Sequence, residues 1–106
     1  MKIYNHYVNG KEMEPNSKKY FETENPYTCE KWAKIAKGDL YDVDIAVNVA
    51  KEAFEKKWSK TKPTIRGKLL VKLAELVERD FQRLGEIEVQ DNGKLIAEMG
   101  AQTKYL

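Results

Sequence analysis

Few residues of the chain carry side chains that could perform chemistry. There is one cysteine, Cys29, and one histidine, His6. An imidazolium stabilises a thiolate, so a Cys–His pair could supply a nucleophile. However, the spacing of these two residues matches no catalytic motif, and lone cysteines and histidines are usually structural. A structural zinc site is also disfavoured, because it needs four Cys or His ligands.

The other candidates also favour structural roles. Asp39, Asp42 and Asp44 cluster where a helix is expected to begin, so we interpret them as capping residues rather than acid–base groups. Trp32 and Trp58 could stack on a ligand, but such side chains more often fill a core. The glycines are too widely separated for a dinucleotide-binding loop. They are Gly10, Gly38, Gly67, Gly85, Gly93 and Gly100.

The composition predicts one small folded domain. The 106 residues are 42% hydrophobic and 34% charged, which is too apolar for a disordered tail. The formal charge is only +2 and the lysines are spread along the chain, so we expect no nucleic-acid partner. No apolar run approaches the ~18 residues of a membrane span, so no membrane partner is expected either. A single cysteine and no signal-peptide pattern at the start favour a cytoplasmic protein.

Positions 1–36 are predicted to form strands and a hairpin. Asn9-Gly10 suits a type I′ turn between two short extended runs. Positions 20–24 are aromatic and β-branched, and Asn25-Pro26 should end that strand because a residue before proline avoids the helical region. After a turn, positions 31–36 form the next candidate strand.

Positions 39–106 are predicted to be helical. Asp39 is a plausible N-cap for the first helix. Ile45 and Val49 widen the apolar face of this helix, so we expect it to be well buried. Glu52 and Lys56 are placed for an i,i+4 pair. The rest of the apolar face comprises Val43, Ala46, Val47, Ala50, Ala53 and Phe54.

Trp58 to Lys94 suggests two successive amphipathic helices. Pro63 suits the first position of one helix, and Asp80 could end that helix and cap the next. Gly93 should stop the second helix by adopting the left-handed conformation. Helical spacing then resumes and continues to Leu106, so we expect this chain to be a piece of something longer. The apolar stripes are Leu69, Leu70, Leu73, Leu76 and Val77, then Phe81, Leu84 and Ile87.

These elements, in this order, resemble the amino-terminal part of the NAD(P)-dependent aldehyde dehydrogenases, almost end to end. The resemblance implies an α/β fold, or α+β for this piece alone, with short strands before three to four helices. It implies a partial domain over 1–106, the leading part of the cofactor-binding domain. The matching pieces are Tyr7-Val8-Asn9-Gly10, Phe21-Glu22-Thr23-Glu24-Asn25-Pro26, Gly38-Asp39, Asp42-Val43-Asp44, Ala46-Val47, Ala53-Phe54, Trp58, Arg66, Leu69-Leu70, Leu73-Ala74, Asp91-Asn92-Gly93-Lys94 and Glu98.

The resemblance also implies a function for a longer enzyme. Such an enzyme oxidises aldehydes to carboxylic acids with NAD or NADP, and we expect it to be a homo-oligomer. Its catalytic cysteine and nucleotide-contacting motifs lie beyond the matched region, so no catalytic or cofactor-binding residue is carried over. We therefore expect this chain alone to bind no cofactor and to be inactive. The alternative is a non-enzymatic module that associates through its apolar helix faces.

The resemblance to the family also implies one partial metal site in this chain. Some family members hold a monovalent cation at positions matching the backbone carbonyls of Thr23 and Glu24 and the carboxylate of Asp91. Hard cations prefer such oxygen ligands. A further ligand would lie outside this sequence. The alternative interpretation of Asp91 is a hydrogen bond at a helix end or turn.

Three departures from the family pattern affect local stability. Cys29 occupies a turn position where glycine is usual, which should strain that turn. Ile65 replaces an acidic residue in the first helical turn, so a capping box is lost. Lys62 replaces a hydroxyl cap, for which Thr61 could substitute.

Overall fold

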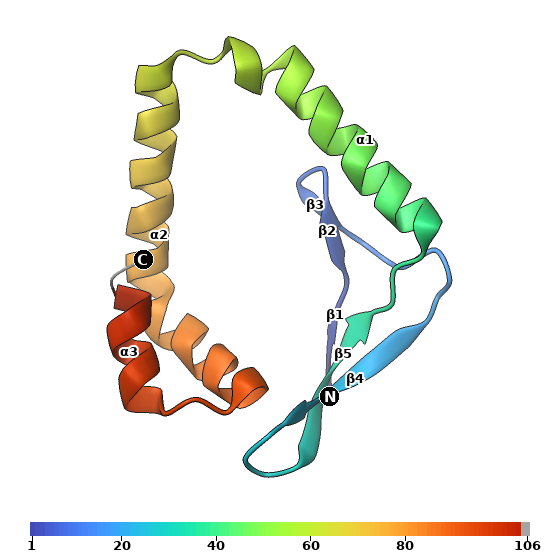
Figure 1. Cartoon of the computed structure of the whole chain (residues 1–106), viewed down its shortest axis with the longest axis vertical. Helices are drawn as coiled ribbons and strands as arrows, with labels where there is room; N and C mark the ends of the chain where they lie inside the picture. The colour runs from blue at the N-terminus through green and yellow to red at the C-terminus, as the bar shows by residue number, and fades with distance from the viewer. Residues whose placement is uncertain (105–106) are drawn as a thin grey trace. The chain divides into compact units, whose positions relative to one another are not determined.

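The computed structural model describes residues 1–104 and divides the chain into two compact units (Figure 1). The first unit comprises Met1–Thr23 and Lys31–Thr61; the second comprises Glu24–Glu30 and the chain from Lys62 onward. The predicted order of short strands followed by helices is confirmed, with three α-helices. The helical spacing predicted at Leu106 lies outside the described residues. In chain order the elements are β1 (Lys2–Tyr4), β2 (His6–Val8), β3 (Lys11–Met13), β4 (Tyr20–Asn25), β5 (Glu30–Ala36), α1 (Leu40–Lys56), η1 (Trp58–Lys60), α2 (Pro63–Asn92) and α3 (Ile96–Lys104).

Two small sheets form from the strands. One has the order β1-β5-β4, with β1 parallel to β5 and Ile3 paired with Lys34. Ala33 on β5 is fully buried, and the Trp32 ring meets Tyr4 edge-to-face with 5.9 Å between centroids. Trp32 therefore has the structural role expected of it. Strands β2 and β3 pair antiparallel, with Val8 opposite Lys11.

The turn between β2 and β3 has the predicted conformation. Asn9 has φ 54° and Gly10 has φ 76°, so both residues adopt the positive values that a type I′ turn requires. The twist of this turn matches that of the flanking strands, which is why two residues suffice to reverse the chain. The hairpin predicted from Asn9-Gly10 is confirmed.

Helix α1 begins where predicted but is less buried than expected. Asp39 is its N-cap, and Glu52 pairs with Lys56 near its C-terminal end. Along its apolar face, Val43, Val47 and Phe54 are 54%, 59% and 57% exposed. The prediction of a well-buried helix is therefore wrong for the described residues. Only part of this face meets the β2–β3 turn: Ala46, Ala50 and Ala53 line a groove of about 400 Å³ beside that turn, and the three exposed side chains do not.

Helix α2 is one continuous helix, so the prediction of two helices meeting at Asp80 is wrong. The Asp80 carboxylate accepts hydrogen bonds from Arg79 at 3.0 and 2.8 Å and lies 3.7 Å from Arg83. The Arg79 hydrogen bond, followed by the charges of Arg79 and Arg83, lowers the pKa of Asp80. Within residues 1–104 the Asp80 carboxylate accepts from no backbone N–H. Figure 1 shows instead a bend in the lower, orange part of α2.

The start of α2 is poorly capped. Lys62 is the N-cap and makes no side-chain capping hydrogen bond, whereas Pro63 occupies the first turn as predicted. The Thr61 hydroxyl donates to the carbonyl of Lys57 at 2.8 Å. Thr61 therefore belongs to the end of the preceding segment, and the suggestion that it replaces the missing cap is wrong. Without an acidic residue in its first turn, α2 also lacks a charge that would favour the helix dipole.

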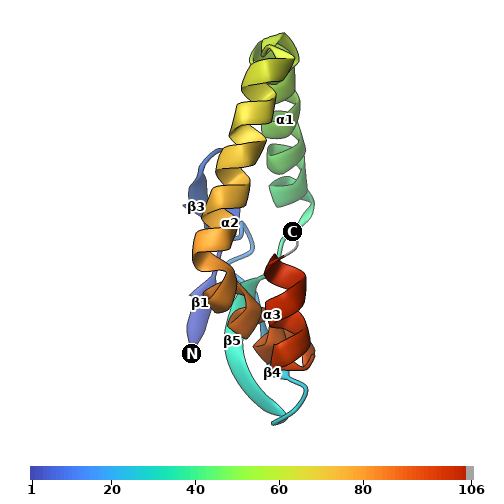
Figure 2. The ribbon, with the colours of Figure 1, turned by 90° about the vertical axis from the view of Figure 1, so that its left-hand side faces the viewer.

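Helix α3 lies alongside α2 in both views (Figures 1 and 2). Met99 on α3 is only 2% exposed, and Gly85 on α2 is also buried. A small cavity of about 150 Å³, lined in part by Phe81, Ile96 and Gly100, remains near the two helices. Burial of Met99 and Gly85 makes this helix pair the packed core of the second unit.

Gly93 ends α2 in the way the sequence predicted. It has φ 75°, in the left-handed region, and its N–H donates to the carbonyl of Val89 at 2.9 Å. A Cβ atom at this position would lie 3.2 Å from Cβ of Pro26. Glycine is thus required both by the backbone conformation and by the close approach of the Asn25-Pro26 turn.

Replacement of Gly93 by alanine should destabilise the fold by about 2 kcal/mol, because the left-handed conformation costs an L-residue 1–2 kcal/mol and the Pro26 contact adds strain. Gly67 is the matched control, since it lies inside α2 and a Cβ atom added there would have no neighbour within 4 Å. Gly67→Ala should stabilise by about 1 kcal/mol through helix propensity. Urea unfolding of both variants measures the difference; a Gly93→Ala variant as stable as the original would contradict this account.

Candidate functional site

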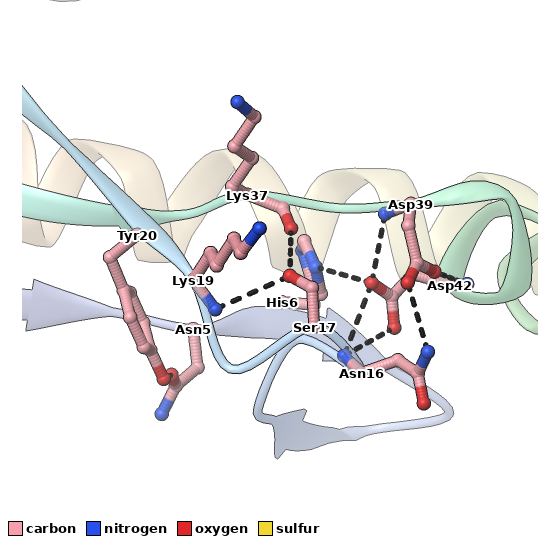
Figure 3. Close-up of polar contacts among 9 residues, drawn as sticks. All are labelled: Asn5, His6, Asn16, Ser17, Lys19, Tyr20, Lys37, Asp39 and Asp42. Atoms are coloured by element: carbon pink, nitrogen blue, oxygen red, sulfur yellow. Dashed lines mark hydrogen bonds and ion pairs between the residues drawn. The ribbon is translucent and has the colours of Figure 1, made fainter.

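The most connected polar group in the first unit is the carboxylate of Asp42, which is 5% exposed (Figure 3). It accepts a hydrogen bond from the backbone N–H of Asn16 at 3.0 Å and from that of Asp39 at 3.0 Å. In return, the Asp39 carboxylate accepts from the N–H of Asp42 at 3.1 Å, which completes a capping box. The predicted capping role of Asp39 and Asp42 is confirmed.

His6 approaches the same carboxylate from strand β2. Its Nε2 atom lies 3.6 Å from Oδ2 of Asp42, beyond hydrogen-bonding distance. The Nε2 atom is buried and has no hydrogen-bond partner among the described residues. The ring lies against Gly38, where an added Cβ would be 3.3 Å from Cε1 of His6. The imidazole therefore fills the space between β2 and the start of α1.

Neighbouring hydrogen bonds bind the loop that follows β3 to the end of β5. The Ser17 hydroxyl donates to the carbonyl of Lys37 at 3.1 Å (Figure 3). The Lys37 N–H donates to the carbonyl of Lys19 at 2.9 Å. The Tyr20 hydroxyl donates to Oδ1 of Asn5 at 2.9 Å. These contacts link three segments of the first unit, at Asn5, positions 17–20 and Lys37.

The electrostatics of the cluster also indicate a structural role. The side-chain amide of Asn16 donates to the Asp39 carboxylate at 2.9 Å and, together with the N–H of Asp42, lowers the pKa of Asp39. A carboxylate held ionised by N–H donors is a poor general base at neutral pH. Asn16 was not identified from the sequence, because its partners lie 23 and 26 residues away and no local pattern links them.

The residues predicted to bind a cation lie on two elements. Thr23 and Glu24 belong to β4, and Asp91 is the exposed penultimate residue of α2. Glu24 and Asp91 belong to the second unit, where the turn that follows Glu24 contacts Gly93, two residues after Asp91. Residues 1–104 contain no group of three or more His, Cys, Asp or Glu side chains that could hold a metal ion.

Cys29 lies in the turn between β4 and β5. It is exposed, with no disulfide, and it adopts φ 58°. Its N–H donates to the carbonyl of Asn25 at 2.8 Å, which closes the turn. The strain predicted for a non-glycine residue here is thus present in the backbone. His6 belongs to the other unit, so neither unit by itself contains both members of a Cys–His pair.

Of the helices in the described part of the chain, none combines the length and apolarity that crossing a bilayer demands.

Similarity to known proteins identifies the family of the chain, which the geometry of the polar cluster does not. The profile of the aldehyde dehydrogenase family matches residues 13–106. The chain is 39% identical over its whole length to (Z)-2-((N-methylformamido)methylene)-5-hydroxybutyrolactone dehydrogenase of Acinetobacter baylyi, of which it covers 22%.

Two solved structures are also similar. Betaine aldehyde dehydrogenase of Staphylococcus aureus, in complex with NAD+, aligns with a TM-score of 0.89 and 28% identity over 93% of this chain and 20% of that one. A 3,6-anhydro-L-galactose dehydrogenase in complex with NADP aligns with a TM-score of 0.91 and 28% identity, over 97% of this chain and 21% of that one. The chain spans about a fifth of the length of the relatives it matches.

Replacement of Asp39 by alanine should lower the melting temperature by several degrees at pH 6, because the helix loses its N-cap. The lowered pKa of Asp39 means that its contribution is present above the ordinary aspartate value of about 3.9 and is lost as the pH falls through the lowered value. The difference in melting temperature between the original protein and the Asp39→Ala variant should therefore shrink below about pH 4. Thermal unfolding monitored by circular dichroism checks this, with exposed Asp44→Ala as the control. A difference that is constant down to pH 2 would contradict it.

Proposed function

Because the chain belongs to the aldehyde dehydrogenase family, we propose that it forms the leading part of the cofactor-binding domain of an enzyme that oxidises an aldehyde to a carboxylic acid with NAD or NADP. The family match over residues 13–106 carries this proposal. The nicotinamide cofactors named for two structural relatives support the choice of cofactor class. By family resemblance the enzyme is homo-oligomeric, and the single thiol of this chain favours a cytoplasmic setting.

The role proposed for this chain is to support the cofactor-binding domain and not to take part in catalysis. Its capped helices and short strands support the cofactor domain, and none of its residues is assigned to the cofactor or to the reacting aldehyde. In such an enzyme a thiolate would attack the aldehyde carbonyl, the nicotinamide cofactor would supply the hydride acceptor, and water would release the acid. The thiol of this chain, Cys29, lies in an exposed turn and is not assigned to that step. The isolated chain is accordingly inactive.

A second candidate is a non-enzymatic association module. The observation that favours it is the exposure of apolar side chains on both long helices, including Val47 and Phe54 on α1 and Leu70 and Leu73 on α2. Exposed apolar surface on a helix promotes association. The two candidate functions predict different oligomeric states for the isolated chain in solution.

The purified 106-residue chain should give no NADH or NADPH above a buffer blank when mixed with cofactor and simple aldehydes, whereas a full-length protein that carries this chain should do so. Turnover by the isolated chain that disappears in Cys29→Ser would refute the proposed supporting role. Sedimentation equilibrium of the same sample at low micromolar concentration separates the candidates: a monomer counts against the module, and a defined oligomer supports it.

We further propose that Thr23 and Glu24, through their backbone carbonyls, and Asp91, through its carboxylate, contribute to a monovalent-cation site. Oxygen ligands of this kind suit hard cations. The contact between Pro26 and Gly93 supports the proposal, because it joins the segments that carry Glu24 and Asp91 within the second unit. Additional ligands come from outside this chain.

Potassium or sodium, compared with choline at equal ionic strength, should stabilise a full-length protein that carries this chain. At ten times its Kd, a bound cation contributes about 1.4 kcal/mol. Asp91→Asn should abolish this difference, while Glu78→Gln, which removes an exposed carboxylate of the same helix, should preserve it. Thermal unfolding across a titration of each salt measures the effect. An unchanged potassium response in Asp91→Asn would remove Asp91 from the site.

A further inference from the structure

The chain contains the dipeptide Asn-Gly twice, at Asn9-Gly10 and at Asn92-Gly93. In such a pair the backbone nitrogen of glycine can attack the side-chain amide carbon of asparagine, because glycine has no side chain to hinder the approach. The two sites have the same local sequence but opposite structural environments. We propose that Asn9 is a site of spontaneous deamidation and isoaspartate formation in the native protein, and that the fold protects Asn92.

Both reacting groups at Asn9 are unengaged. The side-chain amide of Asn9 and the backbone N–H of Gly10 make no hydrogen bond to any of residues 1–104. Both residues are exposed, and nothing lies within 4 Å of a Cβ position built at Gly10. The nucleophile, the electrophile and space for water are therefore all present at the tip of the β2–β3 hairpin.

At Asn92 both reacting groups are engaged in hydrogen bonds. The N–H of Gly93, which would be the nucleophile, donates to the carbonyl of Val89 at 2.9 Å. The side-chain amide of Asn92 donates to Glu88 at 3.3 Å, and its oxygen accepts from the N–H of Lys94 at 2.9 Å. Asn92 is exposed like Asn9, so these hydrogen bonds, and not burial, distinguish the two sites.

The reaction needs only water. After the Gly10 amide loses its proton, its nitrogen forms a bond to Cγ of Asn9, the bond from Cγ to Nδ2 breaks, and ammonia leaves. Water then opens the resulting cyclic imide at either carbonyl. Opening at one carbonyl produces aspartate, and opening at the other produces isoaspartate, in which the main chain runs through the former side chain. One water is consumed, one ammonia is released, and the chain gains one negative charge.

The isoaspartate product would alter the hairpin locally. It adds one carbon to the backbone of a two-residue turn whose register places Val8 opposite Lys11. It also puts a carboxylate beside the groove that Asn9 and Gly10 line together with Ala50 and Ala53 of α1. Deamidation of Asn9 therefore places a charge and an altered turn beside the alanine-lined side of this helix.

The test compares the two sites within one protein. The folded chain is incubated at mildly alkaline pH for several days, and peptide mapping by mass spectrometry quantifies asparagine, aspartate and isoaspartate at each site. In the folded state Asn9 should deamidate about tenfold faster than Asn92, because reaction at Asn92 requires local opening of its hydrogen bonds. In concentrated urea the two rates should converge to within about twofold, since both become unstructured Asn-Gly pairs.

Equal rates in the folded state, or a faster reaction at Asn92, would overturn the proposal. The variant Asn9→Gln provides the control, because the longer side chain disfavours the cyclic imide. It should abolish the new acidic species at the hairpin and leave the rate at Asn92 unchanged. Persistence of that species in Asn9→Gln would assign the modification to another residue and would equally refute the proposal.

Discussion

The first unit depends on the buried carboxylate of Asp42. A carboxylate in so buried a position needs hydrogen-bond donors around it, and here the donors come from the loop after β3 and from the N-cap of α1. His6 on β2 closes the remaining side. A single short side chain therefore determines where the hairpin, the loop and the helix meet. The buried apolar residues described in this unit are small, namely Pro15, Ala33 and Ala36, so the hydrogen bonds to Asp42 supplement a small apolar core.

Positive backbone angles fix chain reversals within each of the two units. Asn9 and Gly10 reverse the chain between β2 and β3, and Cys29 does so between β4 and β5. Gly93 ends α2 and leaves room for Pro26. Glycine and asparagine occupy such positions at little cost, whereas a cysteine does not. The strained Cys29 is held because its own N–H bond to Asn25 is part of the turn.

Features that depend on a few neighbouring residues could be predicted from the sequence. The Asp39 cap, the Asn9-Gly10 turn and the helix stop at Gly93 are all of this kind. The helix boundary predicted at Asp80 was wrong because an aspartate carboxylate can bind either backbone N–H groups or arginine, and here it binds Arg79. The bond from Asn16 to Asp42 spans 26 residues, so no local rule could reveal it. For the cation ligands, only family resemblance was available.

Helical periodicity identifies which side of a helix is apolar but not what covers it. On α1 the period correctly groups Val43, Val47 and Phe54, yet these side chains are more than half exposed in the described chain. Burying one such side chain fully contributes about 1.5–3 kcal/mol. If these exposed side chains were all buried, the added stabilisation would be comparable to the net stability of a small domain. A helix can therefore be amphipathic, well capped and correctly bounded while most of its potential stabilisation still depends on a surface that packs against it.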